Sequence, residues 1–219
     1  MPSVIETKGV AEGAFQYLRV HIITGHIAPS SKLNETELSL KLEISRPPLR
    51  EAFRRLENER LVASIPRRGC YVTEVSLENC REICQAWEMM ELFAVDLLRL
   101  ESNKDLDEVD AALFKATDHP AQPSSDPFQQ FEYLKTITDF HLKLVEAARN
   151  MTLTHLYNSI LPSLARYQSM FISDRATKEH QAIIRLLRKR KHAEAKKILG
   201  KHIRHHCDQM ETKMTDQTK

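Results

Sequence analysis

The chain has 219 residues, of which 42% are apolar and 28% charged, so it can bury a sizeable core and is not disordered in its main state. No run approaches the roughly 18 to 20 apolar residues that a membrane span needs, and four cysteines are too few for a disulfide framework. The net charge of +2 is small, but residues 46–68 hold seven arginines against three glutamates, a stretch suited to a polyanion. We therefore expect a cytoplasmic protein with no membrane segment, and the few glycines and aromatic residues favour helices.

The first quarter of the sequence predicts three short helices. Residues 11–24 have apolar side chains at helical spacing. Asn34, with Glu37 three residues later, has the pattern of a capping box at the start of a second helix. Ser45 is predicted to cap a third helix, which ends near Asn58 and has two prolines in its first turn.

A basic hairpin is predicted after these helices. The segment LVASIPRRGCYVTEV, residues 61–75, alternates like two short strands joined by a basic tip at residues 66–69. Three helices and a two-stranded ribbon are typical of a winged helix-turn-helix, in which the second helix of the pair enters the major groove. Arg46, Arg50 and Arg54 recur at intervals of four on one face of that helix. The alternative is a solvated face paired with nearby glutamates, but the basic hairpin tip favours DNA binding.

The remaining two-thirds of the chain predicts helices only. The predicted helices cover residues 78–100, 105–117, 128–148, 152–171, 178–190 and 192–210, with a kink expected at Pro162. Because the boundary falls in a short polar turn, we predict two domains, residues 1–76 and 77–219. The predicted fold class is mainly α, with a winged helix-turn-helix followed by an all-α bundle of about six helices.

Three histidines lie on the apolar faces of three different predicted helices: His141, His180 and His202. Each apolar face must point inward, so the three imidazoles are expected to converge, and neutral imidazole is a common ligand of Zn, Ni, Cu and Fe. We predict a divalent transition metal here, Zn or Ni, with His206 available as an extra ligand. The alternative for each residue is a core histidine that hydrogen-bonds to a carbonyl group or a water molecule.

A three-histidine metal with an open coordination position would also suit a metal-dependent hydrolase. The sequence contains no GxSxG, no glycine-rich phosphate loop and no HExxH motif. No obvious general base stands near these histidines in the sequence. We therefore expect a protein that is not an enzyme, with the hydrolase as the enzymatic alternative.

The segment LNETELSLKLEISRPPLREAFRRLENERLVASIPRRGCYVTEV resembles the helix-turn-helix and wing of the GntR transcription regulators almost throughout. A weaker resemblance covers DFHLKLVEAARN, the EHQAI stretch and the KHIRHH stretch, which are similar to the helical FCD effector domain of the FadR-like branch. Together these segments span nearly the whole chain. The resemblance implies a bacterial regulator that binds DNA with its first domain and an effector with its second.

The resemblance also implies which residues contact operator DNA. The positions that match the family's contacts in the helix-turn-helix are Thr36, Ser45, Arg46 and Arg50. Arg68 and Gly69 fall at the wing tip, which reaches the minor groove in similar proteins. We assign Arg54, Arg55 and Arg67 to phosphates. Pro47 stands where the family often has threonine, so the phosphate contact of that threonine is not expected here.

In similar effector domains, a divalent metal is held by an aspartate one turn before a histidine and by two later histidines. The three histidines match as His141, His180 and His202, but Ile137 stands in the place of the aspartate. The resemblance therefore implies a metal site that lacks its carboxylate ligand. We expect weaker metal binding than in a site that has one.

An arginine that suits carboxylate effectors in this family is also replaced. It sits one turn before Glu91, where this sequence has Trp87. The effector is therefore expected to be less acidic than the usual small organic acids, or to be held by another residue such as Arg166. We assign Trp87 and Arg166 to effector binding on this basis.

The sequence predicts a one-component transcription regulator that acts as a homodimer on an inverted repeat of double-stranded DNA. A small-molecule effector, of the organic acid class or close to it, is expected to control its operator affinity. A DNA-binding architectural protein without a sensor is the further alternative, since it would need the basic domain but no pocket.

Overall fold

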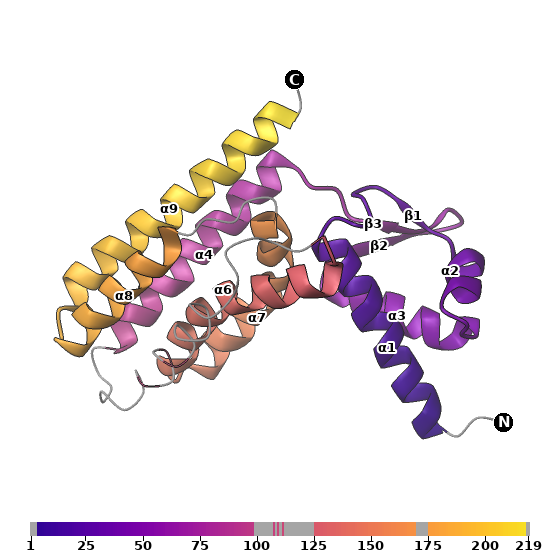
Figure 1. Cartoon of the computed structure of the whole chain (residues 1–219), viewed down its shortest axis with the longest axis horizontal. Helices are drawn as coiled ribbons and strands as arrows, with labels where there is room; N and C mark the ends of the chain where they lie inside the picture. The colour runs from indigo at the N-terminus through magenta and orange to yellow at the C-terminus, as the bar shows by residue number, and fades with distance from the viewer. Residues whose placement is uncertain are drawn as a thin grey trace. The chain divides into compact units, whose positions relative to one another are not determined.

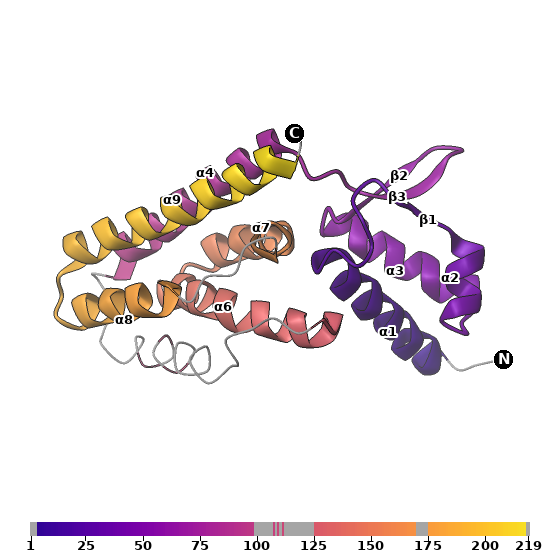
Figure 2. The same cartoon turned by 45° about the horizontal axis from the view of Figure 1, so that its top comes forward.

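The computed structural model describes residues 4–98, 107, 109, 111, 125–169 and 175–217. The chain divides into two compact units, Met1–Val75 and Ser76–Lys219, called the N-terminal unit and the C-terminal unit below (Figures 1 and 2). It is mainly helical, with one small antiparallel sheet in the N-terminal unit, as the sequence predicts. Among the described residues, no helix combines the length and apolarity that crossing a membrane requires.

The N-terminal unit is built from three helices and three short strands. Its elements are α1 (Val4–Ile23), β1 (Lys32–Leu33), α2 (Glu35–Lys41), α3 (Arg46–Asn58), β2 (Val62–Ile65) and β3 (Gly69–Val72). The sheet order is β1-β3-β2, with β2 and β3 forming the predicted hairpin. Strand β1 adds a third strand to the predicted two, and its two residues are too few to show an alternating pattern.

The core of the N-terminal unit lies between α1 and α3, which pack along one another (Figure 2). Leu18 of α1 and Leu49 and Leu56 of α3 are completely buried. Helix α1 begins at Val4, earlier than the predicted residue 11. The apolar pattern did not reveal this first part, because Gly9 and Val10 are exposed and continue no apolar face.

The two predicted helix caps have different outcomes. Asn34 caps α2, since its Oδ1 accepts hydrogen bonds from the backbone N–H groups of Thr36 and Glu37 at 3.0 and 3.4 Å. Ser45 stands at the N-cap position of α3, as predicted, but its side chain makes no cap hydrogen bond. The N–H groups that a cap side chain would bind belong to the second and third residues of the helix, and these are Pro47 and Pro48, which have none.

The C-terminal unit is a bundle of long helices. Those described are α4 (Leu77–Leu98), α6 (Pro127–Ala147), α7 (Met151–Ser169), α8 (Arg175–Arg188) and α9 (His192–Gln217). Helices α4 and α9 lie side by side, α8 packs on α9, and α6 packs on α7 (Figures 1 and 2). Their bounds lie close to the predicted ones, except that α9 continues past residue 210, where Met214 extends its buried face by a turn.

Two sequence predictions concern less regular parts of this unit. The helix predicted over residues 105–117 lies largely outside the described residues; the three that are described, Asp107, Val109 and Ala111, are helical. Pro162 lies inside α7 and is buried. Among the described residues of this unit, the largest completely buried side chains are Trp87, Phe140 and Tyr157, from α4, α6 and α7, so the core lies where these helices meet.

Candidate metal centre and nucleic-acid interface

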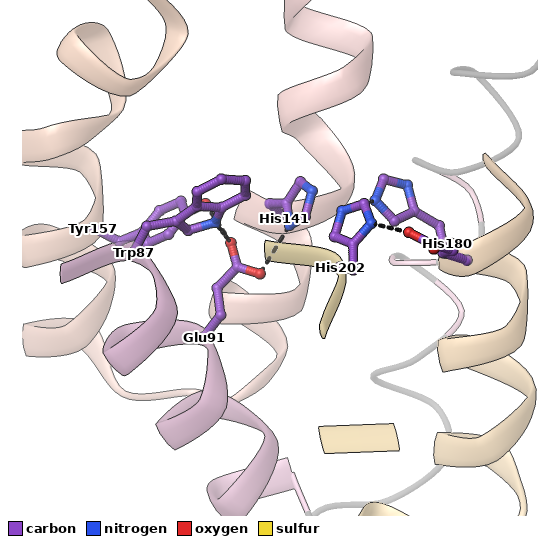
Figure 3. Close-up of polar contacts among 7 residues, drawn as sticks. Trp87, Glu91, His141, Tyr157, His180 and His202 are labelled. Carbon is purple, nitrogen blue, oxygen red and sulfur yellow. Dashed lines mark hydrogen bonds and ion pairs between the residues drawn. The ribbon is translucent and has the colours of Figure 1, made fainter. Parts of the chain in front are cut away.

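The three predicted histidines meet in the interior of the C-terminal unit. His141 comes from α6, His180 from α8 and His202 from α9, and each side chain is almost completely buried. One ligand atom from each lies within 4.8 Å of the others, and Figure 3 shows the three imidazoles gathered at one place. Each histidine lies on the buried face of its own helix, so folding the bundle brings the three together.

The spacing of two of these imidazoles suits a shared metal ion. The Nε2 atoms of His180 and His202 lie 3.1 Å apart. Two nitrogen atoms bonded to one metal at about 2.0–2.1 Å are separated by about 2.9 to 3.4 Å, depending on the angle at the metal. Without a metal, one Nε2 must carry a proton and donate it to the other. A divalent cation can replace that proton, since metal binding takes the place of protons on its ligands.

Carboxylates hold the far side of two of the imidazoles. The Nδ1 of His141 is 2.8 Å from Glu91 Oε2, and the Nδ1 of His202 is 2.6 Å from Glu179 Oε2. With Nδ1–H donated to a carboxylate, the Nε2 lone pair of each ring is left for a metal. A carboxylate in this position also makes the imidazole more basic and offsets the charge of the ion.

Glu91 is the most deeply placed acid of the described C-terminal unit, with no exposed surface. Besides its contact with His141, it accepts hydrogen bonds from the indole N–H of Trp87 and from the Tyr157 hydroxyl at 2.7 Å (Figure 3). Donors from three helices therefore fix its position, and it in turn fixes the ring of His141. One sign of this role is visible in the sequence, an acidic residue on the apolar stripe of α4, but no local pattern pairs it with His141.

Burial favours the uncharged form of His180, His202 and His206. It lowers the pKa of His180 well below its ordinary value and that of His202 to about 4, although Glu179 acts in the opposite direction on His202. Burial also lowers the pKa of His206, one turn after His202, to about 3. The rings of His202 and His206 are 4.5 Å apart, but the three-histidine group does not include His206. Neutral imidazole is the form that binds metals.

These pKa values predict that acid destabilises the metal-free C-terminal unit. The unfolded imidazoles take up protons near pH 6.5, whereas folded His202 does so near pH 4 and folded His206 near pH 3. Between those values only the unfolded chain gains protons, so the free energy of unfolding falls as the pH falls. The loss is about 2 kcal/mol for each of these histidines between pH 7 and pH 5.

Urea unfolding with a chelator present measures this loss. Trp87 is the only tryptophan of the chain, so its fluorescence follows the C-terminal unit. His206→Leu should reduce the pH dependence, and His155→Gln, at an exposed position of α7, should not. Equal stability of the wild type at pH 7 and pH 5 would contradict the assignment of neutral, buried imidazoles.

The residues predicted around the effector lie at buried positions. Trp87 is completely buried, and its ring lies 5.2 Å from that of His141. Arg166 of α7 is also buried, at 6% exposure, and burial lowers its pKa to about 10. Ile137, in the place of the family's aspartate, is half-buried on α6, one turn before His141.

The predicted DNA-contacting residues all lie on the surface of the N-terminal unit. Every one of the following is exposed: Thr36, Ser45, Arg46, Arg50, Arg54, Arg67, Arg68 and Gly69. Two arginines of α3 reach back to the start of α2, since Arg46 Nη2 donates to Thr36 Oγ1 at 3.3 Å and Arg50 pairs with Glu35 at 3.0 Å. Arg54 pairs with Glu51 on its own helix at 2.7 Å. Glu35 was not identified from the sequence, and the structure shows it paired with the predicted DNA-contacting residue Arg50.

The wing tip is a tight turn with two arginines. The backbone N–H of Arg68 donates to the Ile65 carbonyl at 3.0 Å, and Arg67 is in the left-handed region with a φ of 62°. Gly69 follows with a φ of 110°, a conformation that side-chain-bearing residues rarely adopt. Both arginines are exposed, and they lie in the turn between β2 and β3. Figure 2 shows this hairpin extending from the N-terminal unit.

Two sequence families match the two units. The family described as "Bacterial regulatory proteins, gntR family" matches residues 10–72, and the FCD domain matches residues 82–205. The chain belongs to the GntR family of transcription regulators and has an FCD domain. The family consists of regulators and not of enzymes, so the three-histidine group of this GntR protein is not evidence of a hydrolase.

Individual relatives are similar over most of the chain. The Nta operon transcriptional regulator of Aminobacter aminovorans is 28% identical over 190 residues, 86% of this chain and 88% of that protein. The HTH-type regulator YdhC of Bacillus subtilis is 24% identical over 90% of this chain and 88% of its own. A GntR regulator structure from Rhodococcus sp. RHA1 has a TM-score of 0.74 at 21% identity, covering 91% of this chain and 96% of that one, and shows the same fold.

Proposed function

We propose that this GntR protein is a metal-containing sensor, whose affinity for operator DNA changes when a small molecule binds beside the ion. The observation that carries the proposal is the buried group of His141, His180 and His202, with Glu91 and Glu179 behind two of the three rings. A DNA-binding architectural protein without a sensor has no use for so many buried polar groups, whose desolvation costs stability.

The donor set fits a divalent transition metal such as Zn or Ni. Three imidazole nitrogens are available, and the two carboxylates behind them supply the negative charge that Ile137 cannot. When bound, the ion would act as a Lewis acid that attracts a carboxylate or another chelating group of the effector. Arg166 and Trp87 are the residues we assign to the rest of the effector, Arg166 as a buried cation and Trp87 as an apolar wall.

Helices α4 and α7 connect this site with Ser76, the first residue of the C-terminal unit. Glu91 lies on α4, whose first turn follows Ser76. Tyr157 lies on α7, and near the other end of that helix the Tyr167 hydroxyl donates to the Ser76 carbonyl at 3.2 Å. A shift of α7 relative to α4 on effector binding would therefore reach the residue at which the two units join.

DNA binding is proposed to use residues 1–76 of a homodimer, with α3 in the major groove and the wing tip at the minor groove. A two-fold dimer reads two half-sites at once, so the expected operator is an inverted repeat. Residues 77–219 are proposed to carry the dimer contact and the effector site.

A binding screen with the full-length, untagged protein tests the proposal. Sequences selected from random duplex DNA should form an inverted repeat, and light scattering should give two chains per duplex. A thermal-shift screen of small organic acids on Zn-loaded protein should find ligands that stabilise the C-terminal unit, by about 2.7 kcal/mol at 100 times the dissociation constant. Selection of no common sequence would contradict the DNA assignment, and stabilisation equal in His180→Ala would contradict the sensor assignment.

A further inference from the structure

Glu35 holds one edge of the Arg50 guanidinium in the N-terminal unit. Arg50 Nε donates to Glu35 Oε1 and Oε2 at 3.2 and 3.1 Å, and Arg50 Nη2 lies 3.0 Å from Oε2. The pair joins the first residue of α2 to the second turn of α3. The Arg50 side chain is 65% exposed and that of Glu35 only 34%, so the carboxylate forms a partly sheltered base and the guanidinium faces solvent.

The contact leaves a particular set of donors free. A guanidinium carries five N–H groups in a planar fork: one on Nε and two on each Nη. Glu35 occupies the side edge, formed by Nε and Nη2. The end edge, formed by Nη1 and the outer N–H of Nη2, still offers the two parallel donors that fit guanine O6 and N7.

The negative charge of Glu35 also favours a base over a phosphate as the partner of Arg50. A free arginine on a DNA-binding face can bind a phosphate as readily as a base, since both are acceptors and the phosphate carries the charge. A carboxylate already bound to Arg50 removes part of that attraction and itself repels phosphates. The remaining advantage of Arg50 is its fixed, directional end edge, which favours a base over the backbone.

We infer that Glu35 is a positioning residue that makes Arg50 read a base instead of binding a phosphate. The inference rests on the proposed role of α3 in operator binding. It predicts two effects of opposite sign when the charge of Glu35 is removed: weaker discrimination between sequences, and tighter binding to DNA in general. A loss of folding would instead weaken binding to every sequence.

Glu51 provides a matched control on the neighbouring turn. It pairs with Arg54 through the same edge, with Arg54 Nε 3.0 Å from Oε2 and Nη2 2.7 Å from Oε1. The exposed fractions are similar, 65% for Arg54 and 44% for Glu51. Since Arg54 is assigned to a phosphate, Glu51→Gln removes the same charge from the DNA-binding face without disturbing a base contact.

The experiment compares wild type, Glu35→Gln and Glu51→Gln in fluorescence anisotropy on the operator obtained by selection and on a random duplex. Glu35→Gln should lower the ratio of operator to random affinity by about tenfold, part of the roughly 5- to 150-fold that one bidentate arginine contact supplies. It should also raise the affinity for the random duplex by about two- to fivefold. Glu51→Gln should raise both affinities and leave their ratio unchanged.

The outcomes separate this inference from the proposed function. A wild-type protein that does not distinguish operator from random DNA would overturn both. A wild type that does distinguish them, with the same ratio in Glu35→Gln, would overturn only the role of Glu35. Weaker binding of Glu35→Gln to both duplexes would also overturn it, since that result indicates a structural role.

Discussion

Arg50→Ala is expected to remove most of the sequence discrimination of the N-terminal unit while leaving it folded. Arg50 is exposed, so the substitution opens no cavity in the core. Losing a bidentate contact to a base lowers the ratio of operator to random affinity by roughly 5- to 150-fold. Arg46→Ala is expected to act in the same way, because Arg46 lies one turn earlier on the same face of α3.

Arg67→Ala should behave differently, because the wing tip is assigned to the backbone of the DNA. It should weaken binding to operator and random duplex alike and reduce the slope of log affinity against log salt concentration by about one. Fluorescence anisotropy at several salt concentrations measures both effects. If Arg50→Ala keeps the wild-type ratio, base readout by Arg50 is wrong, whatever Arg67→Ala shows.

The second large effect is expected at the metal centre. His180→Ala removes one of three nitrogen ligands and should abolish high-affinity binding of Zn or Ni. Glu91→Gln keeps all three ligands but weakens the hold on His141, and should cost about 10- to 100-fold in metal affinity. Ile137→Asp should tighten metal binding by adding a charged ligand one turn before His141.

Titration of metal-free, untagged protein with Zn and Ni measures these affinities. His155→Ala is the control for loss of an imidazole, because His155 is exposed on α7. The same negligible uptake by wild type, His180→Ala and Ile137→Asp would show that the three histidines are core residues. Uptake that is unaffected by Glu91→Gln would show that Glu91 stabilises the fold without tuning the ligand.

Much of the N-terminal unit could be predicted because its signals are local. Asn34 and Glu37 lie three residues apart, and the apolar face of α3 and the alternating strands of the hairpin are each visible within one segment. Ser45 is the N-cap residue of α3 as predicted, and the sequence also contains the reason why its side chain makes no cap hydrogen bond, since Pro47 and Pro48 leave no N–H groups for it to bind. Strand β1 exists through its pairing with β3, which is a tertiary contact.

In the metal centre, too, the features with a local signal could be predicted and those that depend on tertiary contacts could not. Periodicity placed His141, His180 and His202 on buried faces, and their convergence follows from packing those faces together. Glu91 and Glu179 could not be assigned in this way, because their partners lie on other helices. The expectation of weaker metal binding considered only the metal ligands, and the carboxylates of Glu91 and Glu179 add negative charge that it left out.

The contact between Glu35 and Arg50 was also out of reach of the sequence. The two residues are 15 positions apart, and only the angle between α2 and α3 brings them together. From charge counting alone, both residues belong to a solvated surface with pairs of opposite charge. The structure adds the geometry of the pair, in which Glu35 of α2 holds one edge of the guanidinium of Arg50 on α3 and the other edge is free.

Operator affinity with and without the effector tests the central claim most directly. The measurement uses the Zn-loaded protein, the selected operator and the organic acid that gives the largest thermal shift. In the wild type, a saturating concentration should change the operator dissociation constant by about 5- to 150-fold, the usual range of coupling between two sites. In His180→Ala the same concentration should leave it unchanged. An operator affinity that does not respond in the wild type, or responds equally in His180→Ala, would contradict the account.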